Sequence, residues 1–178
     1  MFINPKTAIE RGWVQGIKNP DKQIQPNAID FTLDKAFHIE DSREFFVSEQ
    51  SKVMKGSTPY EPHALPTATD DGWGWAIGSG SRIDCLSDIY CDLPGGVSAM
   101  LVIRSTLARN GLILTCGLYD SGFRGHIGFL LHNPSRMPAY IAKGTRVGQI
   151  IFVLAESAGT YAGGYNHEHG TDLEYQSG

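Results

Sequence analysis

Short apolar or alternating segments, separated by Gly, Pro, Asn or Asp, run through most of this chain and constrain its fold more than any other feature. They are Ile29–Leu33, Val97–Ile103, Leu112–Thr115, Ile127–His132 and Val147–Leu154. Short segments with frequent turn residues between them are typical of β-strands in a barrel or jelly roll. The sequence therefore predicts an all-β (mainly β) fold, as a β-barrel or jelly roll.

Two short helical pieces are predicted beside the strands. Asn4 suits a helix cap, Pro5 suits the first turn, and Gly12 is placed to end a short N-terminal helix of roughly two turns. A further helical turn is predicted at Leu107–Arg109. Neither piece is long enough to change the fold class.

The chain of 178 residues suits one domain, which we assign to residues 1–158. Residues 56–80 are rich in Pro, Gly, Thr and Ser, and predict a long surface excursion with Trp73 and Trp75 packed back on the body. Residues 159–178 are Gly-rich and polar, with little to pack against. They predict a flexible C-terminal tail that is free to close over an active site.

Charge and hydropathy exclude several classes of protein. A net charge of −4 argues against a surface that coats nucleic acid, although a few cations suffice for a small phosphate ligand. The sequence contains no apolar run of about 18 residues, so no transmembrane helix is predicted. The first residues also lack the basic segment followed by an apolar segment that is typical of a signal peptide. The expected location is therefore cytoplasmic, with no nucleic-acid or membrane partner.

The cysteines argue against a zinc enzyme. Cys85, Cys91 and Cys116 are widely spaced, with no C-x-x-C pair, which disfavours a disulfide framework or a cysteine zinc site. A zinc-dependent nucleotide deaminase needs H-x-E and P-C-x-x-C segments to hold the metal. The sequence contains neither segment.

Several polar residues stand where they can bind phosphate or activate water. Arg104 and Ser105 end a strand-like segment before a turn, and a guanidinium, a hydroxyl and turn N–H groups can bind phosphate oxygens. Arg109 adds a nearby cation, and Gln149 follows a Gly-bounded segment as a neutral donor. Asp120 lies in a Gly-bounded turn, where a carboxylate can act as general base. Each residue alone also fits an ordinary solvated or turn-capping role.

Four segments in order resemble successive motifs of the dUTPase/dCTP deaminase superfamily. They are Ile24–Phe31 (IQPNAIDF), Arg104–Leu112 (RSTLARNGL), Gly117–Gly125 (GLYDSGFRG) and Gly144–Phe152 (GTRVGQIIF). The resemblance implies a distorted β-barrel that forms a homotrimer, with active sites built across subunits. It also implies one of two reactions, hydrolysis of dUTP to dUMP and pyrophosphate with Mg²⁺, or deamination of dCTP to dUTP without zinc; some members catalyse both.

One position favours hydrolysis. In the deaminases, the residue three positions before Asn133 is a glutamate that moves protons, whereas this chain has Leu130 there. The sequence of Gly117–Asp120 (GLYD) also resembles the corresponding motif of the dUTPase branch. His132 is a candidate base only if no β-bulge separates it from the face of Leu130. The resemblance therefore favours dUTP as the substrate.

The resemblance also assigns roles. Asp120 would activate the water that attacks the α-phosphorus, and Asp30 would support the site. Mg²⁺ would be held mainly by substrate phosphates and water, with no direct protein ligand. Phe123 would lie under the deoxyribose, and the hairpin backbone near Leu114–Gly117 would read the uracil edge. The substrate-binding residues implied are Arg104, Ser105, Arg109, Gly117, Phe123, Gln149 and Tyr165.

Several alternatives stay open. The first motif and the tail resemble the deaminase branch, and the tail contains no Lys or Arg. These features also fit a dCTP deaminase, a bifunctional enzyme, or a pyrophosphatase for another or modified deoxypyrimidine triphosphate. His167 and His169 suit a contact with the terminal phosphate, a metal site or a solvated tail. An inactive nucleotide-binding regulator and a capsid-like structural role are the non-enzyme alternatives.

Overall fold

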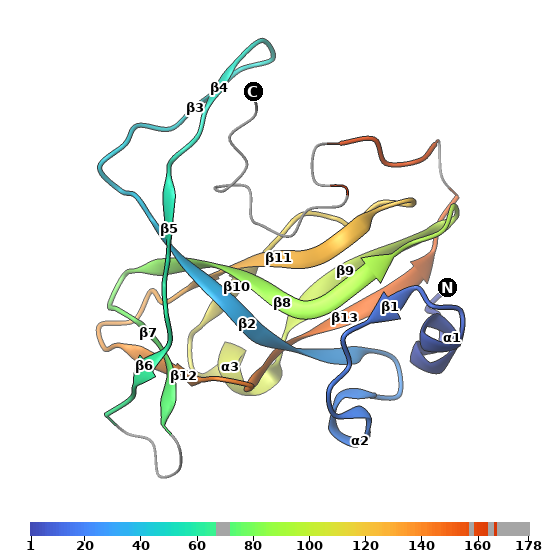
Figure 1. The fold of residues 1–178 in the computed structure, drawn as a ribbon, viewed down its shortest axis with the longest axis horizontal. Helices are drawn as coiled ribbons and strands as arrows, with labels where there is room; N and C mark the ends of the chain where they lie inside the picture. The colour runs from blue at the N-terminus through green and yellow to red at the C-terminus, as the bar shows by residue number, and fades with distance from the viewer. Residues whose placement is uncertain (67–71, 157–158, 164–165, 167–178) are drawn as a thin grey trace.

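A computed structural model of the protein describes residues 1–66, 72–156, 159–163 and 166 (Figure 1). An eight-stranded antiparallel sheet forms its body, in the order β10-β11-β8-β2-β13-β9, with β1 paired to β8 and β5 to β2. The strands are β1 (Val14–Gln15), β2 (Ile29–Ile39), β5 (Ser57–Pro59), β8 (Arg82–Asp92), β9 (Val97–Ile103), β10 (Ile113–Thr115), β11 (Arg124–His132) and β13 (Arg146–Leu154).

The sheet almost closes on itself. An isolated bridge between Ala99 and Tyr119 joins the last strand, β9, to the segment that follows the first strand, β10. The predicted all-β, barrel-like fold is therefore confirmed, and all five predicted strand segments lie within or overlap observed strands.

Two small sheets flank the body. One is β12 (Ala139–Ala142), β7 (Trp73–Ile77) and β6 (His63–Ala64), and the other pairs β3 (Phe46–Val47) with β4 (Lys52–Val53) in an arm that projects from the body (Figure 1). Residues 56–80 thus contain short strands besides loops. Trp75 is buried as predicted, but the prediction for Trp73 is wrong, because this first residue of β7 lies at the end of the small sheet and is 58% exposed.

The helices are short. Asn4 caps α1 (Pro5–Glu10) with its side chain, which accepts a hydrogen bond from the N–H of Lys6, and α1 ends before Gly12, as predicted. The predicted turn is part of α3 (Ser105–Arg109). An additional helix, α2 (Pro20–Gln23), begins after the Asn19 cap. None of the helices in the described part of the chain has the length and apolar character that crossing a bilayer requires.

A close contact between β2 and β13 positions the polar site. Gly148 lies beneath the buried ring of Phe31, and a Cβ at this glycine would lie 2.2 Å from the ring carbon Cζ. The same ring packs against Phe129 with 5.1 Å between centroids. The register of β2 and β13 shifts between Arg146 and Gly148, next to this contact. The glycine therefore lets the two strands approach where their polar residues meet.

Gly16→Ala is expected to lower the free energy of unfolding by about 2–3 kcal/mol, combining left-handed strain with overpacking. Gly16 has φ 89°, and a Cβ there would lie 2.0 Å from the carbonyl oxygen of Asp88. Gly12→Ala is the matched control, since Gly12 has φ 72° but open space around it. Urea denaturation gives the free energy of unfolding of both variants. Equal decreases in this free energy would contradict the clash at Gly16.

Candidate functional site

A buried carboxylate organises the polar centre of the sheet. Asp30 is 2% exposed. Its Oδ2 lies 2.8 Å from Arg146 Nη1 and 3.4 Å from Arg104 Nε, and its Oδ1 accepts a hydrogen bond of 2.8 Å from Gln149 Nε2. Two guanidinium groups and one amide therefore surround this carboxylate. We call Asp30, Arg104, Arg146 and Gln149 the Asp30 cluster.

Strand register brings the Asp30 cluster together. Gln149 of β13 pairs with Asp30 of β2 on one side and with Val102 of β9 on the other. Arg104 directly follows β9 and is the N-cap residue of α3. Its guanidinium also donates to the carbonyl of Arg146 over 3.3 Å. Three neighbouring strands thus supply the cluster from positions far apart in the sequence.

The cluster leaves polar groups open to solvent. The side chains of Arg104 and Arg146 are 30% and 28% exposed, so donors not used by Asp30 remain accessible. Ser105, the first residue of α3, and Arg109, in its last turn, are exposed beside them in the sequence. This arrangement is suited to oxygens of a phosphate chain, because a guanidinium and an adjacent hydroxyl are efficient phosphate donors.

Asp120 lies in a separate turn. It is exposed, its carbonyl accepts the N–H of Phe123 over 3.1 Å, and Gly122 adopts φ 86° in the same turn. Gly117 is also exposed, just before Tyr119 pairs with Ala99. The structure therefore presents the Asp120 carboxylate to solvent on a tight loop.

The two groups of predicted site residues lie at opposite ends of β9 within one chain. Tyr119, next to Asp120, pairs with Ala99, whereas Arg104 is five residues further along. At about 3.3 Å per residue, this separation is roughly 16 Å along the strand. Figure 1 shows α3 and the start of β11 at opposite ends of the sheet accordingly. One chain alone does not bring Asp120 to the Asp30 cluster.

Phe123 is packed into the core. It is 5% exposed, and its ring contacts the rings of Tyr119 and Tyr161 with centroid distances of 4.9 and 6.0 Å. Little of this ring is left to face a sugar in the observed conformation. Tyr165, the remaining predicted binding residue, lies outside the described residues, as do His167 and His169.

The described part of the tail docks on the Asp120 loop of its own chain. The N–H of Tyr161 donates to the carbonyl of Ser121 over 2.7 Å, and the side chain of Asn166 accepts the N–H of Arg124 over 2.9 Å. The expectation that this segment has little to pack against is therefore wrong for its first residues. Tyr161 finds a partner in the buried ring of Phe123, which sequence reasoning had assigned to the sugar.

Leu130 and His132 lie on one face of β11. The pairing of β11 with β8 runs without a register shift from Gly128 to His132, and the only shift recorded in this pairing precedes Gly128. Leu130 pairs with Asp84 of β8 and with Thr115 of β10. An aliphatic side chain therefore occupies this position, with the carboxylate-bearing residue Asp84 directly opposite.

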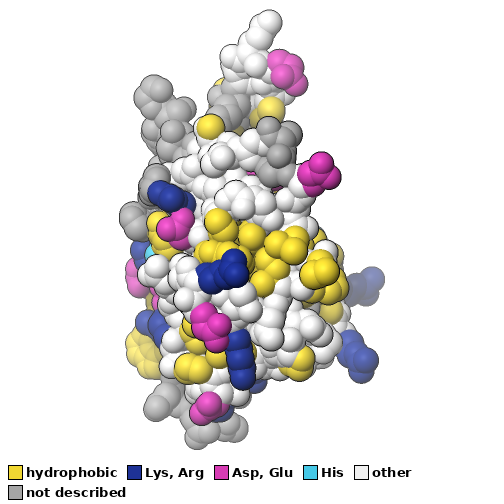
Figure 2. Space-filling model, turned by 90° about the vertical axis from the view of Figure 1, so that its right-hand side faces the viewer, with side chains coloured by type: hydrophobic (Ala, Val, Ile, Leu, Met, Phe, Trp, Pro, Cys, Tyr) yellow, Lys and Arg dark blue, Asp and Glu magenta, His cyan; other side chains and the backbone are white. Residues whose placement is uncertain are grey.

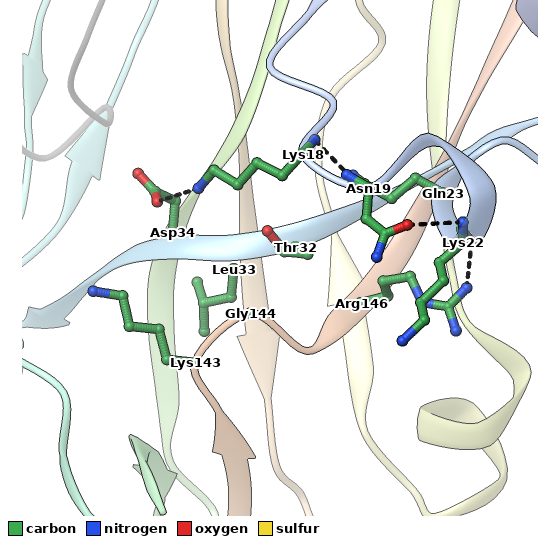
Figure 3. A pocket seen from close by; sticks show the side chains of 10 residues that line it. All are labelled: Lys18, Asn19, Lys22, Gln23, Thr32, Leu33, Asp34, Lys143, Gly144 and Arg146. Atoms are coloured by element: carbon green, nitrogen blue, oxygen red, sulfur yellow. Dashed lines mark hydrogen bonds and ion pairs between the residues drawn. The ribbon is translucent and has the colours of Figure 1, made fainter. Parts of the chain in front are cut away.

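A cavity of about 340 Å³ opens beside the Asp30 cluster (Figure 3). Its walls come from the segment around α2, from β2, and from the turn that joins β12 to β13. Charged residues among its walls are Lys18, Lys22, Asp34, Lys143 and Arg146. Arg146 thus belongs to both the cavity and the Asp30 cluster.

Sequence reasoning missed Arg146 and the three lysines. Arg146 stands inside a recognised motif, between Gly144 and Gln149, but its partner Asp30 is 116 residues away. Although partial burial acts to lower it, the carboxylates of Asp88 and Asp34 raise the pKa of Lys18 above its ordinary value. No sequence pattern signals these lysines, because they come from separate segments. Among the described residues, no group of three or more His, Cys, Asp or Glu side chains is arranged to hold a metal ion.

Apart from those on the β3–β4 arm and around the small sheet that contains β7, exposed apolar side chains form two surfaces on the main sheet. Met100 and Val102 alternate along β9, and Ile113 and Leu118 are exposed around β10. The second surface joins Met1, Phe2 and Leu154, through the bridge from Phe2 to Val153 and the hydrogen bond from Leu154 to Met1. Figure 2 shows hydrophobic side chains gathered on the side of the molecule that carries the N-terminus. Contiguous exposed apolar surface is typical of protein–protein contacts.

Comparison with known proteins places the chain in a family. The model of the dCTP deaminase-like family matches residues 6–155. A probable deoxyuridine 5'-triphosphate nucleotidohydrolase from Methanopyrus kandleri is 31% identical over 147 residues, covering 82% of this chain and 88% of that protein. A dUMP-forming dCTP deaminase from a Sulfurihydrogenibium species is 29% identical over 177 residues, covering 96% and 94%.

A solved structure agrees at the level of the fold. The 2'-deoxycytidine 5'-triphosphate deaminase from Agrobacterium tumefaciens superposes with a TM-score of 0.59 at 15% identity, over 83% of this chain and 44% of that one. The family match over most of the sequence, together with this likeness of fold, establishes that the chain belongs to the dUTPase/dCTP deaminase superfamily, in its dCTP deaminase-like family.

Proposed function

We propose that the protein hydrolyses dUTP to dUMP and pyrophosphate, with Asp120 activating the attacking water. The observation that carries this proposal is the pairing of a pre-ordered, phosphate-suited Asp30 cluster with a separate, exposed Asp120 carboxylate. The name of the Methanopyrus kandleri relative supports dUTP as the substrate.

The phosphate chain would bind at the end of β9. Arg104, Ser105 and Gln149 donate to its oxygens, and Arg109 adds a cation from the last turn of α3. Asp30 fixes the side chains of Arg104 and Gln149 through its ion pair and hydrogen bond, so these side chains lose little conformational entropy when phosphate binds. Asp30 is in this respect a positioning residue.

Asp120 would supply the base. Its exposed carboxylate can accept a proton from water as that water attacks the α-phosphorus in line with the departing pyrophosphate. The backbone near Gly117, on the same exposed segment, would read the uracil edge, and Tyr165 would stack on the base. Phe123 would support this segment from the core or, after a local shift, face the deoxyribose.

A second copy would complete the site. Within one chain Asp120 and Arg104 lie at opposite ends of β9, roughly 16 Å apart at about 3.3 Å per residue. A homotrimer in which the Asp120 loop of one copy faces the Asp30 cluster of the next removes this separation. The exposed apolar side chains of β9 and β10 are suited to such a contact.

Magnesium fits the site through substrate and water more than through protein ligands. Both oxygens of Asp30 already accept donors, whereas the exposed Asp120 carboxylate is the oxygen type that Mg²⁺ prefers through water. When bound, Mg²⁺ would offset the charge of the phosphates and fix their geometry.

The test is direct. Purified protein with Mg²⁺ is incubated separately with dUTP, dCTP and dTTP, and the products are resolved by ion-exchange chromatography. We expect dUMP and pyrophosphate from dUTP, with dCTP unchanged. Formation of dUTP or dUMP from dCTP would replace the proposal with the deaminase alternative. If none of the three nucleotides reacts, the substrate is instead a modified deoxypyrimidine triphosphate, or the protein is an inactive nucleotide-binding regulator.

A dUMP-forming deaminase is the second candidate, since the Sulfurihydrogenibium relative has that name. Leu130 argues against it, because leucine moves no proton. Leu130→Glu is expected to release ammonia from dCTP no faster than the unaltered protein, since the new carboxylate would face Asp84 across the strands without a built proton network. An ammonia assay checks this, with Leu130→Gln as the control of equal size. Efficient deamination by Leu130→Glu alone would contradict the proposed branch.

A further inference from the structure

The cavity beside the Asp30 cluster has more positive charge than its own carboxylates neutralise. Lys18 is paired, with its Nζ 3.3 Å from Asp34 Oδ1 and 3.4 Å from Asp88 Oδ2. Arg146 is paired with Asp30. The ammonium groups of Lys22 and Lys143 have no ion pair or hydrogen bond within the described residues. Two positive charges therefore line the cavity without a counter-charge from those residues.

The cavity is built by separate segments that are locked together. Buried Gln23 accepts the N–H groups of Lys18 and Asn19 over 2.9 and 2.7 Å, and its own amide donates to the carbonyl of Asp30 over 3.0 Å. Arg146 Nη1 donates to the carbonyl of Lys22 over 2.6 Å. The loop that carries Lys18 and Lys22 is thus fixed to the strands of the Asp30 cluster.

The lysines reach the cavity from different sides. Figure 3 shows Lys18 extending toward Asp34 along one edge, Lys143 rising from the turn between β12 and β13, and Lys22 beside Arg146. Gly144, with φ 79°, forms this tight turn and keeps Lys143 at the rim. A volume of about 340 Å³ holds on the order of ten waters, which is enough for a diphosphate or triphosphate group.

We propose that this cavity binds a phosphoric anhydride anion, either inorganic pyrophosphate or the terminal phosphates of a nucleotide. A multiply charged, elongated anion matches two uncompensated ammonium groups on flexible stems better than a single carboxylate does. Arg146 connects this anion to the Asp30 cluster, since it lines the cavity and bonds Asp30. Where the anion is part of the substrate, the inference rests on the proposed function; binding of free pyrophosphate does not.

Isothermal titration with inorganic pyrophosphate tests the site, in EDTA and without nucleotide. The double variant Lys22→Gln/Lys143→Gln is expected to weaken pyrophosphate binding at least tenfold, because each lost charged donor is worth roughly tenfold. Lys6→Gln/Arg136→Gln is the control, since it removes the same net charge from exposed residues that do not line the cavity. The control is expected to stay within about twofold of the unaltered protein, as is usual for distant surface charges.

No pyrophosphate binding by the unaltered protein, or equal weakening in both double variants, would overturn the proposal. Steady-state kinetics then separates the two sources of the anion. Competitive inhibition by pyrophosphate, with a higher KM and unchanged kcat in the lysine variant, assigns the cavity to the terminal phosphates of the substrate. Noncompetitive inhibition with unchanged KM assigns it to a free polyphosphate. Pyrophosphate binding without any dUTP hydrolysis would remove the proposed function and leave the anion site standing.

Discussion

Asp120→Asn is expected to lower kcat for dUTP hydrolysis by roughly 10²–10⁴-fold, the typical worth of a general base. Asparagine has nearly the same shape as aspartate but does not take a proton from water. Because Asp120 is exposed on a loop, the thermal unfolding temperature should not change. Titration with a non-hydrolysable dUTP analogue should also give an affinity close to that of the unaltered protein. Near-normal turnover would remove Asp120 from the mechanism.

A mixing experiment extends this test to the second copy. Arg104→Ala alters the phosphate end of the site and Asp120→Asn alters the base, so each variant alone has strongly reduced activity. If each site of a trimer takes these residues from two neighbouring copies, every trimer that contains both variants has both intact residues in about one third of its sites. Co-expression with two different tags, followed by sequential purification, provides the mixed assembly. Activity that stays at the level of the single variants would place the whole site within one chain.

Asp30→Ala is expected to destabilise the fold by about 3 kcal/mol, because it leaves two arginines without the buried carboxylate that compensates them. This value is at the lower end of the usual range, since the guanidinium-bearing side chains are 30% and 28% exposed. For a chain of this size, the unfolding temperature should fall by roughly 6–12 °C. Activity should fall as well, because Arg104 and Gln149 lose their common anchor.

Asp34→Ala is the matched control for Asp30→Ala. Asp34 is also an aspartate of β2, but its partner Lys18 has a side chain that is 66% exposed. Exposed ion pairs contribute less than about 1 kcal/mol. Differential scanning calorimetry of both variants compares a buried carboxylate with a partly exposed one on the same strand. Unfolding temperatures that agree within about 2 °C would show that the Asp30 cluster does not stabilise the fold.

Alternation and turn residues were enough to predict the strands that are apolar on one face. β9 is the clearest case, because the predicted bounds Val97–Ile103 are those observed. The central strand β8 escaped prediction, since Asp84, Ser87 and Asp88 interrupt its apolar pattern. Asp88 is nevertheless buried; its Oδ1 accepts the N–H of Thr32, and its Oδ2 lies 3.4 Å from Lys18 Nζ. A buried polar residue of this kind hides a strand from any reasoning that relies on hydrophobic periodicity.

The sequence predicted which residues form the candidate site but not how their side chains are arranged in space. Arg104, Ser105, Asp120 and Gln149 were recognised from their motifs. The motifs did not indicate that Asp30 would hold Arg104 and Gln149, because this depends on the register of β2, β13 and β9. The cavity lysines were missed for the same reason, since Lys22 and Lys143 line one cavity only after β2 and β13 have paired.

The pairing of β2 with β13 also determines when the protein can fold during its synthesis. β2 begins at Ile29, but the residues that pair with it on β13 start at Arg146. A ribosome that adds about 5–20 residues per second needs roughly 6–23 seconds to bridge this gap. During this interval the part of β2 that pairs with β13 lacks that neighbour in the sheet. The nascent chain is therefore expected to depend on chaperones until the last strand emerges, and a message truncated before β13 should yield only aggregated or degraded product.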